Sequence, residues 1–211
     1  AAFRAERVYW NGDVTPYAAR RDAAVRGALG DRGEEHAGRY VHAPGTVRTG
    51  DGGPFKVFTP FYRAWQARPW DRWPEPGAAA AVAGDPGDGI PEAGRPLMAP
   101  GEQAAAERLE SFLERLDRYP EERDRPDLDT TSRLSADLKF GTISPRTVVR
   151  RVEGPGAGRA AFVRQIAWRE FYAQLLAAFP ETRRRAMRPE YDRVAWRRDP
   201  DGFAAWKEGR T

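Results

Sequence analysis

The stretch that most constrains the fold runs from Ala160 to Phe179 and predicts one long helix. Gly158 precedes this stretch and Pro180 follows it, and both residue types commonly mark helix boundaries. When its residues are placed at intervals of about 100°, apolar side chains occupy nearly every side. The sequence therefore predicts a central helix that other helices bury.

Four side chains on this helix need a separate explanation, because they are polar or can stack. They recur at the spacing of one helical face: Gln165, Trp168, Arg169 and Tyr172. Burying a guanidinium is costly unless an anion compensates its charge. Two interpretations of Arg169 are open: an internal ion pair with Glu170 or another carboxylate, or contact with a bound anionic ligand.

A run of polar residues, Thr131-Ser132-Arg133-Leu134-Ser135, precedes a short helix that Gly141 is expected to stop. Its hydroxyls and guanidinium lie where unpaired backbone N–H groups and the helix dipole favour an anion. A flat ligand with phosphates would suit both this run and Arg169. Beyond Gly141, Ser144 is a predicted helix cap and Pro145 the first residue of the next helix.

A further helix is predicted before this run. Its apolar residues follow the i, i+3, i+4, i+7 rule: Leu109, Phe112, Leu113, Leu116 and Tyr119. Its first turn is acidic, as the helix dipole prefers, and Pro120 is expected to end it. The chain after Gly101 is thus predicted to be helical throughout.

The first part of the chain alternates strand and helix patterns. Arg7–Asn11 predicts a strand and Pro16–Leu29 a helix closed by Gly30. Tyr40–His42 predicts another short strand. This order indicates the end of an α/β layer.

The segment that follows links the two kinds of structure. Thr59 is a predicted helix cap, with Pro60 at the first helical position. Between Pro69 and Gly101 the composition changes to Pro, Gly, Ala and Asp without a periodic apolar pattern, which predicts a connector. The predicted organisation is an α/β part at residues 1–68, a connector at 69–100 and an all-α part at 101–211.

Composition limits the available chemistry. The chain has no cysteine and two histidines, which argues against disulfides, a metal site and a histidine-based triad. No long apolar run is present, so we expect a cytoplasmic protein without a membrane partner. Residues 101–132 are acidic and residues 133–211 are rich in arginine, so the latter present either a solvated basic surface or a phosphate-binding face.

Five motifs, in order along the chain, resemble the DNA photolyase and cryptochrome family, most of all bacterial deoxyribodipyrimidine (cyclobutane dimer) photolyases. They are Val8-Tyr9-Trp10-Asn11, Lys56-Val57-Phe58-Thr59-Pro60-Phe61, Thr131 to Ser135 with Lys139-Phe140-Gly141-Thr142-Ile143-Ser144-Pro145-Arg146, Trp168-Arg169-Glu170-Phe171-Tyr172, and Ala205-Trp206-Lys207-Glu208-Gly209-Arg210-Thr211. Each motif is weak alone, but their order over almost the whole chain is specific.

The resemblance implies a fold. An α/β antenna domain precedes an all-α domain that binds FAD, and the expected parts are the end of the first domain, a connector and the first part of the second. On this basis the sequence is expected to lack the start of the antenna domain and the end of the flavin domain. As it stands it is expected to be inactive and to retain FAD poorly.

The resemblance also implies site residues. Positions that match FAD contacts are Tyr119, Thr131, Ser132, Arg133, Leu134, Ser135, Phe162, Gln165 and Arg169. Positions that match DNA contacts are Arg123, Gln165, Trp168, Arg169 and Tyr172, with Trp168 packing on a flipped-out pyrimidine dimer. Trp196 matches an electron-transfer tryptophan, and Asn11 and Lys139 match positions near an antenna chromophore, a deazaflavin or methenyltetrahydrofolate.

The implied activity is light-driven repair of pyrimidine dimers in UV-damaged DNA, by electron transfer from reduced, excited FAD in a monomeric carbon–carbon lyase. Two related classes remain open: a 6-4 photoproduct photolyase, and a cryptochrome photoreceptor without repair activity. Gln165 bears on the choice, because many dimer-specific enzymes have a glutamate there and 6-4 enzymes a glutamine. A cofactor-free, helical nucleic-acid-binding module is a third alternative.

Overall fold

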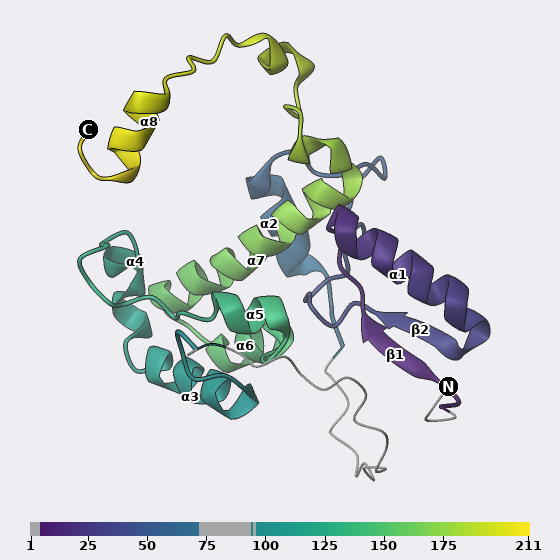
Figure 1. Ribbon diagram of the computed structural model, residues 1–211. Helices are drawn as coiled ribbons and strands as arrows, with labels where there is room; N and C mark the ends of the chain where they lie inside the picture. Colours follow the sequence, from purple (N-terminus) through teal and green to yellow (C-terminus); the bar gives the residue numbers. More distant parts are fainter. Residues whose placement is uncertain (1–4, 72–93, 95) are drawn as a thin grey trace.

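The computed structural model describes residues 5–71, 94 and 96–211. A small α/β unit packs beside a larger group of helices built around one long helix, and a C-terminal arm extends away from both (Figure 1). Most of the predicted connector, residues 72–93 and 95, lies outside the described residues. Within the described part, no helix is long and apolar enough to cross a membrane.

The α/β unit contains two parallel strands joined by a helix. Strand β1 (Val8–Asn11) pairs with β2 (Gly33–His36), and Val8 lies opposite Gly33. Between them, α1 (Pro16–Leu29) has proline in its first turn and Gly30 as its C-cap, with φ of 55°. The first strand and this helix are confirmed, and the parallel pair follows from a helical crossover.

The predicted strand at Tyr40–His42 is wrong, since the second strand is β2 and residues 40–42 form a bent loop. The reason is a long-range contact: the backbone N–H groups of Val41 and His42 donate to the carboxylate of Glu170 instead of to a neighbouring strand.

Helix α2 (Phe58–Ala67) begins earlier than predicted. Val57 is its N-cap, so the prediction that Thr59 caps the helix is wrong and Pro60 lies within the first turn. Proline is tolerated there because the N–H groups of a first turn have no helical partner. The Phe58 ring stacks on Trp168 with centroids 3.6 Å apart, and this packing favours the earlier start.

The next segment is broken into short pieces. Helix α3 (Glu102–Leu113) is followed by a 3₁₀ turn, η2 (Leu116–Arg118), and by α4 (Tyr119–Glu122). The prediction that Pro120 ends one continuous helix is therefore wrong, because Pro120 lies in the first turn of α4. The break lets both Leu116 and Tyr119 reach the core, where they are buried.

Two short helices agree with their local signals. Helix α5 (Ser135–Phe140) ends at Gly141 in the left-handed conformation. Helix α6 (Pro145–Val152) begins after Ser144, whose Oγ accepts a hydrogen bond of 3.2 Å from the Arg146 N–H. Both boundaries depend on the preferences of single residues, which is why the sequence predicts them.

Helix α7 (Ala157–Ala178) is the centre of the helical group and contacts α2, α4, α6 and η2 (Figure 1). Its buried residues are Gly158, Phe162, Ile166, Ala167, Glu170, Phe171 and Gln174. The predicted central helix is confirmed, but Gly158 lies inside it and not before it. A Cβ at Gly158 would lie 2.0 Å from the Leu116 carbonyl oxygen, so glycine permits a close helix contact.

Glu170 joins α7 to the rest of the molecule. Its fully buried carboxylate accepts hydrogen bonds from Trp65 Nε1 at 2.7 Å, from the His42 N–H at 3.1 Å and from the Val41 N–H. Burial raises the pKa of Glu170 to about 7, although these three donors oppose part of the shift. Glu170 thereby holds both α2 and the loop after β2 against α7.

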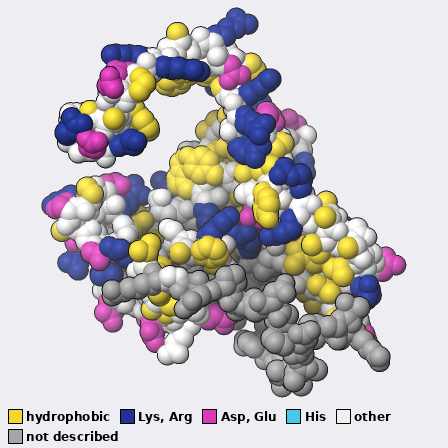
Figure 2. All heavy atoms as spheres, in the orientation of Figure 1, with side chains coloured by type: hydrophobic (Ala, Val, Ile, Leu, Met, Phe, Trp, Pro, Cys, Tyr) yellow, Lys and Arg dark blue, Asp and Glu magenta, His cyan; other side chains and the backbone are white. Residues whose placement is uncertain are grey.

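The C-terminal arm comprises η3 (Pro180–Arg183), η4 (Pro189–Arg193) and α8 (Pro200–Lys207), which arch away from α7 (Figure 1). Trp196 and Trp206 on this arm are 81% and 64% exposed. Lys and Arg side chains gather along the same arm (Figure 2). The predicted basic character of this part is thus distributed over an extended surface.

We predict that Gly158→Ala lowers the free energy of unfolding by roughly 1–3 kcal/mol or more, because the added methyl group overlaps the backbone of Leu116. Thermal or urea denaturation measures the change. Gly27→Ala is the matched control, because nothing lies within 4 Å of its added Cβ on α1, and it should stabilise by about 0.5–1 kcal/mol. Equal effects of the two substitutions would contradict the close contact.

A second prediction concerns pH. The folded protein holds the Glu170 proton more tightly than the unfolded chain, so the stability that this group contributes is full below about pH 4.3 and is lost as pH rises through about 7. Relative to the non-titrating variant Glu170→Gln, the free energy of unfolding should fall by on the order of 3 kcal/mol between acidic and alkaline pH. Urea denaturation across this range tests it, with the exposed Glu114→Gln as control. If the free energy of unfolding changed with pH in the same way in wild type and in Glu170→Gln, the raised pKa of Glu170 would be refuted.

Candidate functional site

A groove of about 910 Å³ lies along α7, between α2 and α4. Its lining is Tyr62, Gln66, Tyr119, Pro120, Arg123, Asp124, Ala157, Ala160, Ala161, Arg164, Gln165 and Trp168. This volume is within the range of ligand pockets, about 300–1,000 Å³. The structure therefore brings four of the predicted site residues together: Tyr119, Arg123, Gln165 and Trp168.

One wall of the groove is a stack of aromatic rings. Trp168 lies flat on Phe58, with an interplanar angle of 7°, and stacks on Tyr172 at 5.5 Å. Phe58 in turn stacks on Tyr62 at 5.6 Å. Of these four rings, Tyr62 and the half-buried Trp168 line the groove, whereas Phe58 and the exposed Tyr172 support them from outside its lining.

The polar side of the groove carries two arginines, two amides and a carboxylate. The Arg164 guanidinium lies over the Tyr62 ring, 5.1 Å from its centroid. Arg123 pairs with Asp124 at 3.4 Å, and Gln165 is half-buried beside them. The sequence did not predict Tyr62, Gln66 or Arg164 as site residues. The position of Arg164 next to Gln165 was the one available signal, while the α2 residues depend on tertiary packing.

Tyr119, which lines the groove, and Phe162, which does not, belong to one aromatic cluster. The rings of Phe112 and Phe162 are 4.6 Å apart, and Tyr119 meets both of them edge-on at 5.4 Å. Burial raises the pKa of Tyr119 above its ordinary value. Phe162 is packed in the core and is absent from the groove lining.

The run from Thr131 to Ser135 lies outside the groove lining. Leu134 is buried, whereas Arg133 is exposed, has a positive φ of 52° and pairs with Asp129 at 2.7 Å. In the described part of the chain, the hydroxyls of Thr131 and Ser135 have no hydrogen-bond partner. Their donors and acceptors are therefore available to a ligand.

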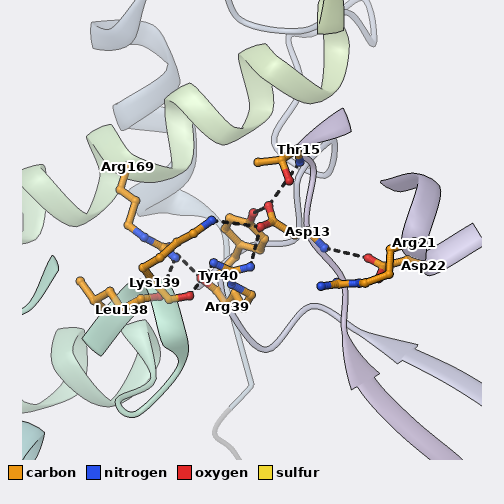
Figure 3. A network of polar contacts seen from close by, with 9 residues as sticks. All are labelled: Asp13, Thr15, Arg21, Asp22, Arg39, Tyr40, Leu138, Lys139 and Arg169. Atoms are coloured by element: carbon orange, nitrogen blue, oxygen red, sulfur yellow. Dashed lines mark hydrogen bonds and ion pairs between the residues drawn. The ribbon is translucent and has the colours of Figure 1, made fainter. Parts of the chain in front are cut away.

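Arg169 is absent from the groove lining and points toward Arg39 and Leu138 (Figure 3). It donates to the backbone carbonyls of Arg39 at 2.7 Å and Leu138 at 3.1 Å, and its guanidinium lies over the Tyr40 ring. Among the described residues it forms no ion pair with Glu170 or another carboxylate, so the first of the two interpretations of Arg169 is wrong. Carbonyl oxygens satisfy the buried guanidinium instead.

The two residues matched to an antenna site belong to β1 (Asn11) and to α5 (Lys139). Asn11 lines a pocket of about 370 Å³ with Arg39 and Leu138. Lys139 is next to this pocket in sequence, and its Nζ lies 3.3 Å from Asp13, which also pairs with Arg39 at 2.6 Å (Figure 3). Burial acts to raise the pKa of Asp13, but Arg39 and Lys139 hold it below its ordinary value.

Trp196 lies on the segment between η4 and α8 and is not among the residues that line the groove. No group of His, Cys, Asp or Glu side chains able to hold a metal ion is found among the residues that the structure describes.

Comparisons with known proteins agree with this arrangement. Residues 1–77 match the family model for DNA photolyase, and residues 162–211 match that for the FAD binding domain of DNA photolyase. A deoxyribodipyrimidine photo-lyase from Halobacterium salinarum is 38% identical, over 98% of this chain and 48% of that protein. One from Streptomyces griseus is 39% identical, with the same coverage.

Solved structures give the same result. A bacterial class III photolyase from Agrobacterium tumefaciens superposes with a TM-score of 0.79 and 29% identity, over 97% of this chain and 47% of that one. A Synechocystis cryptochrome, at 19% identity and a TM-score of 0.71, shares the fold over 98% of this chain and 48% of its own. The chain spans about half the length of the curated relatives it matches. By these matches, the chain belongs to the DNA photolyase and cryptochrome family.

Proposed function

We propose that the protein is a flavin-dependent photolyase that repairs pyrimidine dimers in UV-damaged DNA. The observation that carries this proposal is the groove on α7, where aromatic rings, arginines and amides converge. An extruded base needs an aromatic surface, a hydrogen-bonding partner and cations for the adjoining phosphates, and this groove provides all three. The similarity of the chain to proteins named deoxyribodipyrimidine photo-lyase supports the same assignment.

The domain organisation is proposed to follow the sequence prediction. Residues 1–68 form the end of the antenna domain, residues 69–100 the connector and residues 101–211 the first part of the FAD domain. The match of residues 162–211 to the FAD-binding model supports the last assignment. Because the substrate is DNA, the protein acts in the compartment that holds the DNA, and we expect a monomer.

FAD fits the donors that this chain offers. The free hydroxyls of Thr131 and Ser135, with Ser132, Arg133 and the backbone at Leu134, would contact its phosphates, as anions are bound by N–H and O–H donors before a helix. Tyr119, Phe162, Gln165 and Arg169 are the other proposed contacts, of which Tyr119 and Gln165 line the groove. When bound in its reduced form, FAD supplies the light-excited electron that splits the dimer.

The chain's own residues position the DNA. Trp168 offers a ring already fixed by Phe58, with exposed Tyr172 beside it, on which an extruded dimer packs. Gln165 hydrogen-bonds the lesion as a neutral partner, because an amide both donates and accepts. Arg123, which also lines the groove, contacts the sugar–phosphate backbone of the DNA.

Three further residues are proposed to serve light capture and flavin reduction. Trp196 passes electrons toward the cofactor, and its exposed position leaves it open to reductants in solution. Asn11 and Lys139 contact a second chromophore, a deazaflavin or methenyltetrahydrofolate, at the pocket between the α/β unit and α5.

Because residues 1–211 alone are expected to retain FAD poorly, the tests of this function use a protein extended by the rest of the FAD domain, loaded with flavin and chemically reduced. It is illuminated with duplex DNA carrying one defined lesion. We expect blue light to restore the cyclobutane dimer to two pyrimidines, measured by chromatography of the digested DNA, with no change in the dark. Restoration of only the 6-4 photoproduct would reject our choice of substrate. Retention of flavin without any repair would favour a photoreceptor.

We predict that Trp168→Ala weakens binding to dimer-containing duplex by roughly 1–3 kcal/mol, the usual range for one stacked base, and weakens binding to undamaged duplex much less. Binding is measured in the dark by fluorescence anisotropy. Trp206→Ala, a tryptophan 64% exposed on α8, is the matched control and should leave both affinities unchanged. Equal losses on both DNAs would reject the stacking role of Trp168.

A further inference from the structure

We propose that Arg164 binds a backbone phosphate of the DNA strand at the rim of the α7 groove. This inference deepens the proposed function and rests on DNA being the substrate. Arg164 is not among the site residues that the family resemblance implies. It is identified by its place in the groove lining, by the ring that supports it and by its lack of a carboxylate partner.

The support for Arg164 is an uncharged ring. Its guanidinium lies 5.1 Å from the centroid of Tyr62, an arrangement in which attraction to the ring restrains the side chain. Contact with a ring face leaves the N–H donors in the guanidinium plane free for a phosphate. Arg164 is therefore oriented without using the groups that would bind an anion.

Three other exposed arginines pair with carboxylates. Arg123 in the same groove pairs with Asp124, so a phosphate there competes with a carboxylate. Arg125 pairs with Asp127 at 2.6 Å and Arg151 with Glu110 at 2.5 Å. Within the described residues, Arg164 has neither a hydrogen bond nor an ion pair to a carboxylate. Its positive charge is thus the uncompensated one among the residues that line the groove.

The position of Arg164 suits a phosphate beside an extruded base. Gln165 is its chain neighbour and Trp168 lies one helical turn further along α7, and all three line the groove. A nucleotide that leaves the duplex keeps its flanking phosphates near the mouth of the receiving pocket. A cation next to the lesion-facing residues would hold the strand while the base occupies the groove.

The experiment measures DNA binding in the dark with the flavin-loaded protein, using duplexes with and without one dimer, between about 50 and 200 mM salt. Arg164→Ala should reduce the magnitude of the log–log salt slope by about 0.9, the value for one lost phosphate contact. It should weaken binding to both duplexes on the order of tenfold, because a phosphate contact carries no sequence information. Arg164→Lys should keep the salt slope and lose part of the affinity.

Arg63→Ala is the matched control, because Arg63 is an exposed arginine on α2 outside the groove lining. A salt slope in Arg164→Ala equal to that of Arg63→Ala would overturn the proposal. So would a lower melting temperature without a change in slope, since Arg164 would then only cover Tyr62. Repair by the wild type under light is measured separately: repair with an unchanged slope rejects this inference alone, whereas a changed slope without repair rejects the proposed function alone.

Discussion

The arrangement of the whole molecule depends on the buried carboxylate of Glu170. It accepts three hydrogen bonds, two from the loop after β2 and one from Trp65 on α2. Its neighbour Arg169 binds the same loop, because its guanidinium donates to the Arg39 carbonyl and lies over the Tyr40 ring. Two adjacent side chains of α7 thus hold residues 39–42, and through them the α/β unit, against the helical group. Because α2 is held by the same carboxylate, the wall that it gives to the groove depends on this contact too.

Sequence reasoning failed at this contact for a geometric reason. The triplet Trp168-Arg169-Glu170 suggests an ion pair between its charged members, but consecutive residues of a helix point in directions about 100° apart and do not face each other. Arg169 therefore reaches backbone carbonyls and Glu170 reaches backbone and indole N–H groups. Both side chains find their partners in residues distant in sequence, which no local pattern encodes.

The features that the sequence did predict have local causes. Helix α1 ends at Gly30, α5 at Gly141 and α6 begins after Ser144, each through the conformational or capping preference of one residue. Gly158 was predicted to precede the long helix for the same kind of reason, and this boundary is wrong. Its lack of a side chain permits close contact with Leu116 inside α7. In the groove, the helical spacing of Gln165 and Trp168 predicted their shared position, whereas Tyr62 and Gln66 arrive from a helix far away in sequence.

The packing of α2 on α7 explains how the side chains of Trp168 and Arg164 are held in place in the groove. Phe58 stacks on Trp168 and Tyr62 supports Arg164, so a ring of α2 lies under each of these two α7 side chains. Both pairs are spaced by one helical turn and run in opposite sequence order, as antiparallel helices require. Trp168 and Arg164 are thereby restrained before any ligand arrives, which lowers the entropy lost on binding. Two aromatic residues of α2, Phe58 and Tyr62, thus position the proposed base-stacking ring of Trp168 and the proposed phosphate-binding cation of Arg164.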